Sequence, residues 1–382
     1  MDFDGRDLIF LIGLPRSGTT LLQSLLGQHK DIFTYSESWV LLPPLFWLKE
    51  GKLIAPAYGS SSSTWALEDL LAKSRHGSAT YVEAVRRMVS TLYGSCLEAS
   101  GKRIFLDKSP PYYLIMKEIA DIFPRAKMVV LLRNPLAVLS SIARTWFKGK
   151  CGPILLCPVH THSISVGPYA IAAGLKSLSN QCLTLKYEDL VADPTREIKK
   201  ICEYVDLDFD DKMLSYETRP GGRLGDMEAA KHSRPSTSSL MDWVRLFDDY
   251  ANYKFAISYI DFLGPELFRA LGYDYGETRS AVERSWRDKS DLFRLKARTV
   301  HLLEAANSTM HRSFFATRDA FQIEWNSTWH TYFPRFPPLI PDFRHIEGLN
   351  ALQEKSTIQR LKPVTTIASY WQQLMNYSPS TE

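Results

Sequence analysis

Residues 13–20, with the sequence GLPRSGTT, have the residue types and spacing of a loop that binds a phosphate. In the related GxxxxGK[ST] loop, backbone N–H groups at a helix N-terminus bind phosphate oxygens, because these donors have no partner within the helix and the dipole favours an anion. The two glycines keep that spacing here, but Thr19 stands in the lysine position and the cation is Arg16. A kinase uses the lysine with Mg²⁺ to neutralise phosphate charge, so this loop suits an anion bound without a metal. A structural turn before a helix is the alternative.

Three other polar residues follow short apolar runs. Arg133 and Tyr187 each come directly after a different run, Lys108 is the second residue after another run, and Ser141 lies eight residues beyond Arg133. Taken singly, each has a structural explanation, such as a solvated lysine or a buried tyrosine. Arginine and serine together suit a second, separate phosphate, because the guanidinium offers a planar fork of donors and the hydroxyl one more.

The elements that must position these residues alternate between strands and helices. Strands are predicted from four short apolar runs at residues 8–14, 103–106, 127–132 and 182–186. Apolar residues spaced three to four apart predict helices over residues 19–28, 81–95, 113–122, 135–146 and 194–205. Such alternation predicts a three-layer α/β fold with a central parallel sheet. Ligands of these folds bind at the carboxyl ends of the strands, where all the polar residues above are expected.

The remainder of the chain has a different character. Beyond about residue 207 the strand pattern ends, and residues 219–239, rich in Gly, Arg, Ser and Pro, are predicted to be a mobile loop, which would suit a lid. We predict a first domain over residues 1–275 and a helical, aromatic-rich extension over residues 276–382 that packs on it. A role for one or two of its aromatic residues in an acceptor pocket is the alternative.

Composition excludes several classes of function. The 382 residues carry a formal net charge of +4, too little to indicate a nucleic-acid partner. We expect no membrane anchor, since no stretch approaches the roughly 18 apolar residues of a spanning helix. Five cysteines without a signal sequence predict reduced thiols and a cytoplasmic protein. The spacing of Cys151 and Cys157 fits no zinc motif, and His160 and His162 are predicted to lie in a surface loop, so no metal is expected.

The segments LPRSGTT, FLDKSP, LLRNPLAVLSS and LKYEDLVADP together resemble the sulfotransferases that use 3′-phosphoadenosine-5′-phosphosulfate (PAPS). The resemblance covers residues 8–275 and implies a P-loop-like fold. It implies that Arg133 and Ser141 bind the 3′-phosphate, that Tyr187 lies near the nucleotide, and that Arg234, in a segment closing over it, is a further contact. It assigns the 5′-phosphosulfate to Pro15, Arg16, Ser17, Gly18, Thr19 and Thr20.

The catalytic base departs from the pattern of cytosolic aryl sulfotransferases. Those enzymes carry a histidine two residues after the lysine that Lys108 matches, and here that position is Pro110. In several bacterial, glycan and tyrosine sulfotransferases a glutamate after the first helix serves instead, which points to Glu37. Arg16 and Lys108 would then stabilise the charge on the leaving group. The competing bases are His29, His232, His160 and His162.

The resemblance therefore implies sulfuryl transfer from PAPS, by in-line attack, to a hydroxyl or an amine of a small metabolite or carbohydrate. Residues 39–47 are predicted to be mainly core and secondarily one wall of the acceptor site. Two alternatives remain open. One is a nucleotide kinase, for which Asp107 is the obvious metal-binding acid, and the other is a binding module without catalysis.

Overall fold

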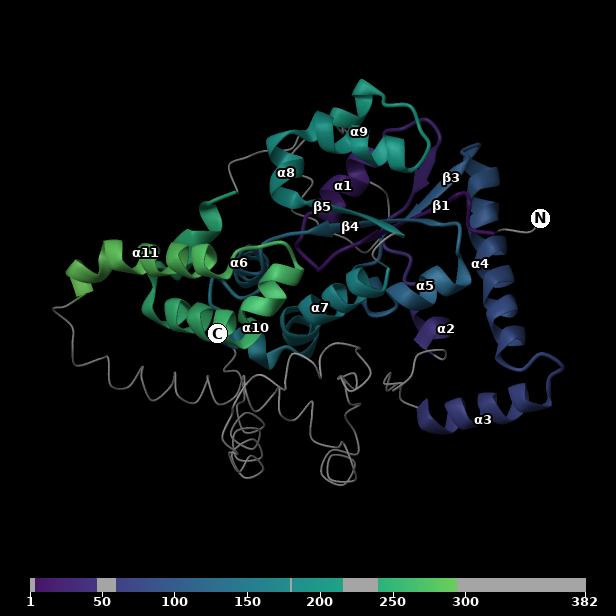
Figure 1. The fold of residues 1–382 in the computed structure, drawn as a ribbon, viewed down its shortest axis with the longest axis horizontal. Helices are drawn as coiled ribbons and strands as arrows, with labels where there is room; N and C mark the ends of the chain where they lie inside the picture. The colour runs from purple at the N-terminus through teal and green to yellow at the C-terminus, as the bar shows by residue number, and fades with distance from the viewer. Residues whose placement is uncertain (1–3, 47–59, 179–180, 216–239, 294–382) are drawn as a thin grey trace, which may run out of the picture.

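A computed structural model describes residues 4–46, 60–178, 181–215 and 240–293 (Figure 1). Its centre is a parallel sheet of five strands in the order β2-β3-β1-β4-β5. The strands are β1 (Leu8–Ile12), β2 (Ile32–Thr34), β3 (Ile104–Asp107), β4 (Lys127–Leu132) and β5 (Cys182–Lys186). The parallel α/β fold predicted from the sequence is confirmed.

Four of these strands correspond to the four predicted apolar runs, and β2 was not predicted. Its three residues are too few to show a pattern, and only Ile32 of the three is buried. Pairing creates this strand, since Ile32, Phe33 and Thr34 lie in register with residues 104–106 of β3 at the edge of the sheet. Short edge strands of this kind depend on their partner rather than on their own sequence.

Helices cover both faces of the sheet. The helix predicted over residues 135–146 is present with the same bounds, and most of the others have shifted ends. The prediction over residues 113–122 divides into a 3₁₀ turn followed by a helix. The α-helices are α1 (Thr19–Leu26), α2 (Leu42–Phe46), α3 (Ser60–Lys73), α4 (Ser78–Ser100), α5 (Met116–Ile122), α6 (Pro135–Trp146), α7 (Pro158–Ser177), α8 (Tyr187–Ala192), α9 (Pro194–Tyr204), α10 (Tyr250–Ala270, kinked at Gly264) and α11 (Tyr275–Phe293). The 3₁₀ turns are η1 (Pro110–Leu114), η2 (Gly152–Leu156), η3 (Asp211–Leu214) and η6 (Asp242–Asp248).

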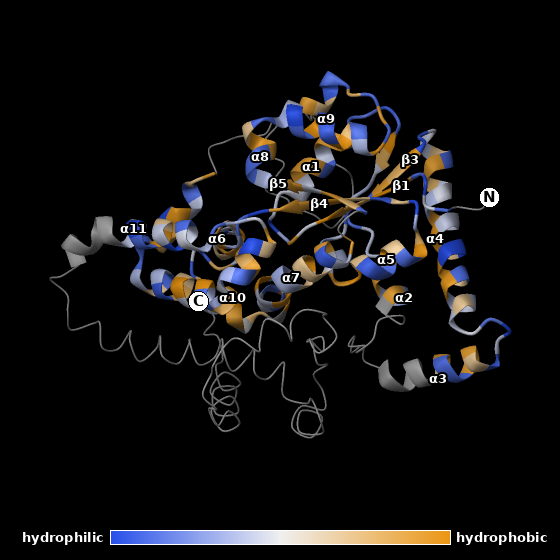
Figure 2. Cartoon of the chain, in the orientation of Figure 1, coloured by the Kyte–Doolittle hydropathy of each residue, from blue (hydrophilic) through white to orange (hydrophobic). Residues whose placement is uncertain are grey.

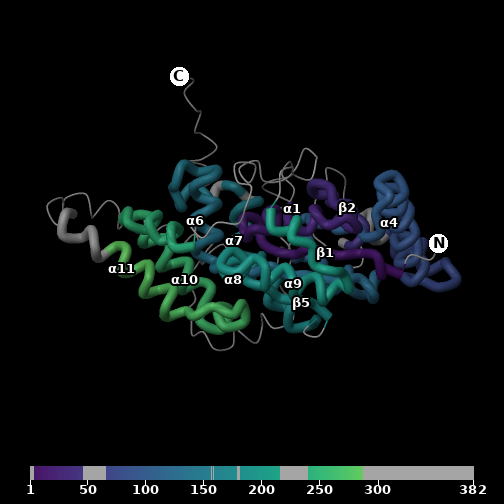
Figure 3. Tube along the Cα trace, turned by 90° about the horizontal axis from the view of Figure 1, so that it is seen from above, coloured from purple at the N-terminus to yellow at the C-terminus, as the bar shows by residue number. Residues whose placement is uncertain are grey.

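Alternate residues of β1 face two separate cores. Leu8, Phe10 and Ile12 pack in the larger core with α4, α5, α6, α7 and α10. Ile9 and Leu11 pack in the smaller core with α1 and α9. The strands are therefore apolar on both faces, as Figure 2 shows by their colour, which explains the continuous apolar runs in the sequence. The helices α4 and α11 lie at opposite ends of the molecule (Figure 3).

At the carboxyl ends of β1 and β4, the connections to the next helices go to opposite faces of the sheet. These strands are neighbours, yet α1 follows β1 onto one face and α6 follows β4 onto the other. Loops that diverge in this way leave a crevice between them, which is where open α/β sheets bind ligands. The phosphate-type loop and Arg133 leave the sheet at this point.

The region around His160 and His162 was predicted incorrectly. Both residues belong to α7 rather than to a surface loop. The ring of His160 stacks on Trp146, with centroids 4.2 Å apart, and His162 Nδ1 lies 3.3 Å from the hydroxyl of Tyr113. Aromatic packing against α6 and η1 thus organises a segment whose own hydrophobic pattern is weak.

Several expectations fall outside the described residues. They include the loop over residues 219–239, with His232 and Arg234, and the extension beyond residue 293. The division into domains at residue 275 stays a prediction, although α11 packs against α10 and η6.

Within the described ranges, no helix is long and apolar enough to cross a membrane, and no cluster of three or more His, Cys, Asp or Glu residues could hold a metal ion.

Candidate active site

The loop between β1 and α1 turns sharply at two residues. Arg16 and Gly18 both have positive φ angles, 69° and 94°, and Gly18 is the N-cap of α1. The buried Ser17 hydroxyl donates to the Leu14 carbonyl at 2.7 Å and closes the turn. The first backbone N–H groups of α1 have no acceptor within the helix, so they are the donors that this loop offers to an anion.

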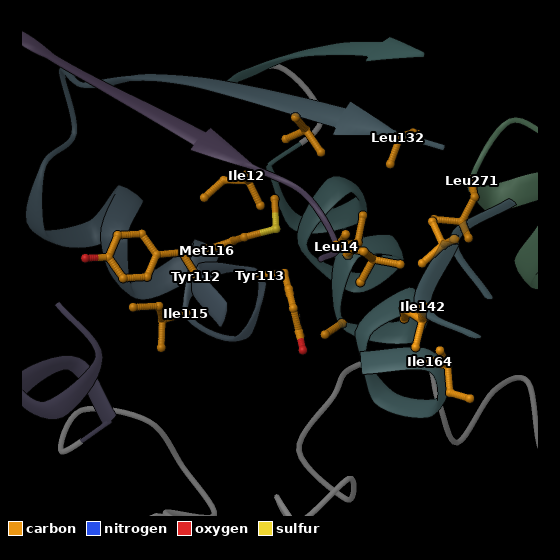
Figure 4. Packing of buried hydrophobic residues seen from close by; sticks show 14 of the residues in the cluster. Ile12, Leu14, Tyr112, Tyr113, Ile115, Met116, Leu132, Ile142, Ile164 and Leu271 are labelled. Carbon is orange, nitrogen blue, oxygen red and sulfur yellow. The ribbon is translucent and has the colours of Figure 1, made fainter. Parts of the chain in front are cut away.

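Apolar packing supports the loop from below. Leu14 belongs to the larger core, and a Cβ on Gly167 of α7 would lie 2.4 Å from its Cδ2 atom. Figure 4 shows Leu14, Tyr113 and Ile164 in this region, with the neighbouring residues Tyr112 and Tyr113 pointing in different directions. The floor of the loop is therefore fixed by close packing, which keeps its N–H groups in place.

Gly18 is required by a close approach as well as by its backbone. A Cβ at this position would lie 2.4 Å from Cδ2 of Tyr187, at the start of α8. The same tyrosine ring supports Arg133, whose guanidinium carbon lies 4.2 Å from the ring centroid. Tyr187 thus fills the space between the phosphate-type loop and Arg133, the residue after β4.

Arg16, Arg133 and Ser141 are brought together as the sequence predicted. Arg16 Nε donates to Ser141 Oγ at 3.0 Å, and Arg133 Nη1 donates to the Arg16 carbonyl at 2.9 Å. The guanidinium of Arg16 also lies 5.5 Å from the centroid of a Trp146 ring. Residues from three separate segments therefore form one cationic cluster at the carboxyl ends of β1 and β4.

The environment of Arg133 favours a bound anion. Its Nε is buried and has no hydrogen-bond acceptor among the described residues. Burial lowers the pKa of Arg133, and the nearby Arg16 adds to this effect, while Tyr187 and Glu188 act in the opposite direction. Two cations held together with an unused donor would both be stabilised by a phosphate group.

Lys108 and Glu37 form an ion pair beside Thr20 of the phosphate-type loop. Lys108 Nζ donates to Glu37 Oε1 at 2.8 Å and lies 3.4 Å from the hydroxyl of Thr20. The side chain of Lys108 is only 1% exposed, so the pair has little competition from water. The other carboxylate oxygen, Oε2, accepts from the indole of Trp39 at 3.1 Å. Both oxygens of Glu37 are thereby fixed beside the first turn of α1.

The competing histidines are not brought to this pair. The ring of His29 is 2% exposed, and its nitrogens contact the Asp208 carbonyl and the Asp31 N–H. His160 and His162 lie on α7 with aromatic partners. Of the candidate bases within the described ranges, Glu37 is the one in contact with Lys108.

Asp107 was noted in the sequence only as a possible metal ligand. Its carboxylate is instead enclosed by hydroxyl groups of Ser38, Tyr93, Ser109 and Tyr112. Burial raises the pKa of Asp107, and these hydrogen bonds lower it in part. The feature of the sequence that could have pointed to this network is an acidic residue at the end of a strand, directly before Lys108.

A comparison with known protein families matches more than half of the chain to one family. Residues 7–211 match the sulfotransferase family. The chain belongs to the sulfotransferase family. The matched segment contains the phosphate-type loop, Glu37, Lys108, Arg133 and Tyr187, so the family resemblance inferred from the sequence is confirmed.

Individual relatives in this family match different parts of the chain. The nodulation protein NoeE of Sinorhizobium fredii is 31% identical over 211 residues, which are 51% of this chain and 48% of NoeE. The chain thus spans about half the length of that relative. Protein-tyrosine sulfotransferase A of Caenorhabditis elegans is 22% identical over 302 residues, 73% of this chain and 72% of that protein. Among solved structures, a sulfotransferase domain from the Synechococcus PCC 7002 olefin synthase is 24% identical with a TM-score of 0.43, covering 62% of this chain and 86% of that domain.

Proposed function

We propose that this sulfotransferase moves the sulfuryl group of PAPS to a hydroxyl or an amine of a small metabolite or carbohydrate, without a metal ion. The observation that carries the proposal is the contact of Lys108 with both Glu37 and Thr20. It joins a cation, a carboxylate and the phosphate-type loop in one cluster. This combination suits the transfer of an acidic group to a nucleophile that must lose a proton.

The residues present fit the nucleotide. The first turn of α1 and Arg16 suit the 5′-phosphosulfate, because they offer backbone N–H donors and a guanidinium. Arg133, with its buried unpartnered Nε, and Ser141 suit a separate 3′-phosphate. When bound, PAPS supplies an activated sulfuryl group on a good leaving group. The role of Arg234 remains a proposal from the family resemblance.

Each residue of the ion pair has its own task. Glu37 accepts the proton of the attacking hydroxyl or amine. Lys108 and Arg16 stabilise the negative charge that develops on the leaving phosphate oxygen, because they are oriented before the reaction begins. Lys108 also holds Oε1 of Glu37, so proton acceptance and charge stabilisation are coupled through one hydrogen bond.

We place the acceptor beside Trp39 and Tyr35. These residues flank Glu37 in the sequence, and their side chains are 41% and 53% exposed. Exposed aromatic rings next to a base suit the apolar face of a sugar or a phenol. Trp39 thus supports the acceptor-wall interpretation of residues 39–47, of which residue 47 lies outside the described residues.

The nucleotide kinase alternative has less support. Thr19, in the lysine position, is buried, and the Asp107 carboxylate is occupied by hydroxyl groups instead of facing the loop as a free metal ligand. Retention of Glu37 beside Lys108 likewise argues against a module that has lost catalysis.

Two measurements test the proposal. The first is calorimetric titration with adenosine 3′,5′-bisphosphate and, separately, with ATP plus Mg²⁺. Micromolar affinity for the bisphosphate without metal, with ATP much weaker, is expected, and preference for Mg·ATP would overturn the donor assignment.

The second measurement is transfer from radiolabelled PAPS to a panel of p-nitrophenol, N-acetylglucosamine and glucosamine. Glu37→Gln should lower turnover roughly 10²–10⁴-fold with bisphosphate affinity retained. Full turnover would exclude Glu37 as the base.

A further inference from the structure

The Asp107 carboxylate is the centre of a buried network of hydroxyl groups. Ser38 Oγ lies 2.9 and 2.8 Å from its two oxygens, and the hydroxyls of Tyr112 and Ser109 donate at 3.0 and 3.3 Å. Tyr93 donates to it as well. The residue is 2% exposed, so its charge is met by these donors rather than by water.

The same hydroxyl groups bind the backbone that follows Glu37. Ser109 Oγ accepts from the Trp39 N–H at 3.0 Å, and the Tyr112 hydroxyl accepts from the Leu41 N–H at 3.1 Å. Trp39 has a φ angle of 56°, a conformation that residues other than glycine seldom adopt. A conformation of this kind persists only where surrounding contacts hold it.

This backbone geometry determines where the Glu37 carboxylate lies. Trp39 is the residue whose indole donates to Oε2 of Glu37, and Ser38 lies between the two. On the other side of the network, Asp107 directly precedes Lys108 at the end of β3. Asp107 is therefore linked to both members of the ion pair. It is joined to Lys108 by a peptide bond, and it is hydrogen-bonded to Ser38, the residue after Glu37.

We infer that Asp107 is a positioning residue, which acts through Ser38, Ser109 and Tyr112 to hold Glu37 against Lys108 in the geometry for proton acceptance. This inference rests on the proposed function, because it takes Glu37 as the base. An apolar residue would satisfy the packing at this point of the strand, but it could not orient the hydroxyl groups that bind the Trp39 and Leu41 amides. The network therefore orients the backbone that follows Glu37, in addition to filling space in the hydrophobic core.

Tyr112→Phe tests the network with a small change, because it removes one hydroxyl and keeps the ring. The matched control is Tyr259→Phe, which removes another fully buried tyrosine hydroxyl, one that donates to the Ile164 carbonyl at 2.8 Å. Two readouts are compared: turnover with saturating radiolabelled PAPS and the best acceptor of the panel above, and hydrogen exchange of the Trp39 and Leu41 amides.

We expect Tyr112→Phe to lower kcat about 10- to 100-fold, because a misplaced catalytic group loses its alignment. Affinity for adenosine 3′,5′-bisphosphate should stay within about two-fold and both amides should exchange faster. Tyr259→Phe should change neither readout. Ser109→Ala, which removes a smaller group from the same network, provides a second variant if Tyr112→Phe does not fold.

The outcomes separate this inference from the proposed function. A wild-type protein without sulfuryl transfer would contradict the proposed function, and amide exchange would still report whether the network holds the loop. An active wild type with full kcat in Tyr112→Phe and Ser109→Ala would overturn the positioning role, whether or not exchange becomes faster. Equal losses of kcat in Tyr112→Phe and Tyr259→Phe would also overturn it, since a general loss of stability would then explain both.

Discussion

The guanidinium of Arg133 lies over the ring of Tyr187, with its central carbon 4.2 Å from the ring centroid. The same ring also approaches Gly18, where a Cβ would lie 2.4 Å from Cδ2. The end of β4, the start of α8 and the start of α1 are therefore packed against one another through a single aromatic ring. Any change in the ring should alter both of the anion sites that we assign.

Tyr187→Leu is expected to weaken binding of adenosine 3′,5′-bisphosphate by about 5-fold, because an arginine over an aromatic face gains on the order of 1 kcal/mol that leucine cannot supply. Tyr187→Phe retains the ring and should stay close to wild type. Calorimetric titration of both variants provides the measurement. Equal affinities of the leucine and phenylalanine variants would show that Arg133 is held by other contacts.

Gly18→Ala is expected to abolish measurable nucleotide binding, since the new methyl group would displace Tyr187 and alter the N-terminus of α1. Gly101→Ala is the matched control. Gly101 also has a positive φ, 64°, but no atom lies within 4 Å of its Cβ position. Both variants should lose roughly 1 kcal/mol of folding stability from backbone strain. Similar bisphosphate affinity in the two variants would contradict the role of this close approach.

Lys108→Met is expected to destabilise the protein by roughly 3 kcal/mol, because it leaves the partly buried Glu37 carboxylate without its partner. The double variant Lys108→Met with Glu37→Gln should recover much of this stability, yet remain inactive. Urea unfolding and sulfuryl transfer, measured on both single variants and the double variant, separate the two effects. Additive stability changes would mean that the ion pair contributes little to the folded state.

Acid should destabilise the protein partly through His162. Burial lowers the pKa of His162 to about 4, whereas an unfolded histidine titrates near its usual value of about 6.5. As the pH falls between these values, the unfolded state gains a proton that the folded state excludes, so stability decreases by up to about 3 kcal/mol. Above pH 6.5 this contribution is complete. His162→Gln should show a smaller loss of unfolding free energy between pH 7 and pH 4.5, and an unchanged loss would contradict the assignment.

The sequence indicated the α/β fold and the strand ends because buried parallel strands leave a strong local signal. The runs at β4 and β5 match the observed strands at both ends, and Asn134 caps α6 as the Asn-Pro pair suggests. The sequence did not predict β2, which depends on pairing with β3. The surface loop predicted around His160 and His162 was wrong, because packing against Trp146 and Tyr113 outweighs a poor local pattern in α7.

By itself, the sequence determined which residue types follow each strand, and it therefore predicted that Arg16, Lys108 and Arg133 lie at the same edge of the sheet. That conclusion needs only the parallel topology, since all carboxyl ends point the same way. Tertiary structure decided the pairings: Glu37 with Lys108, Arg16 with Ser141, and Asp107 with four hydroxyl groups. These depend on how loops distant in the chain fold against one another. Contacts of this kind have no periodicity in the sequence, because they arise from packing and hydrogen bonding between segments rather than within them.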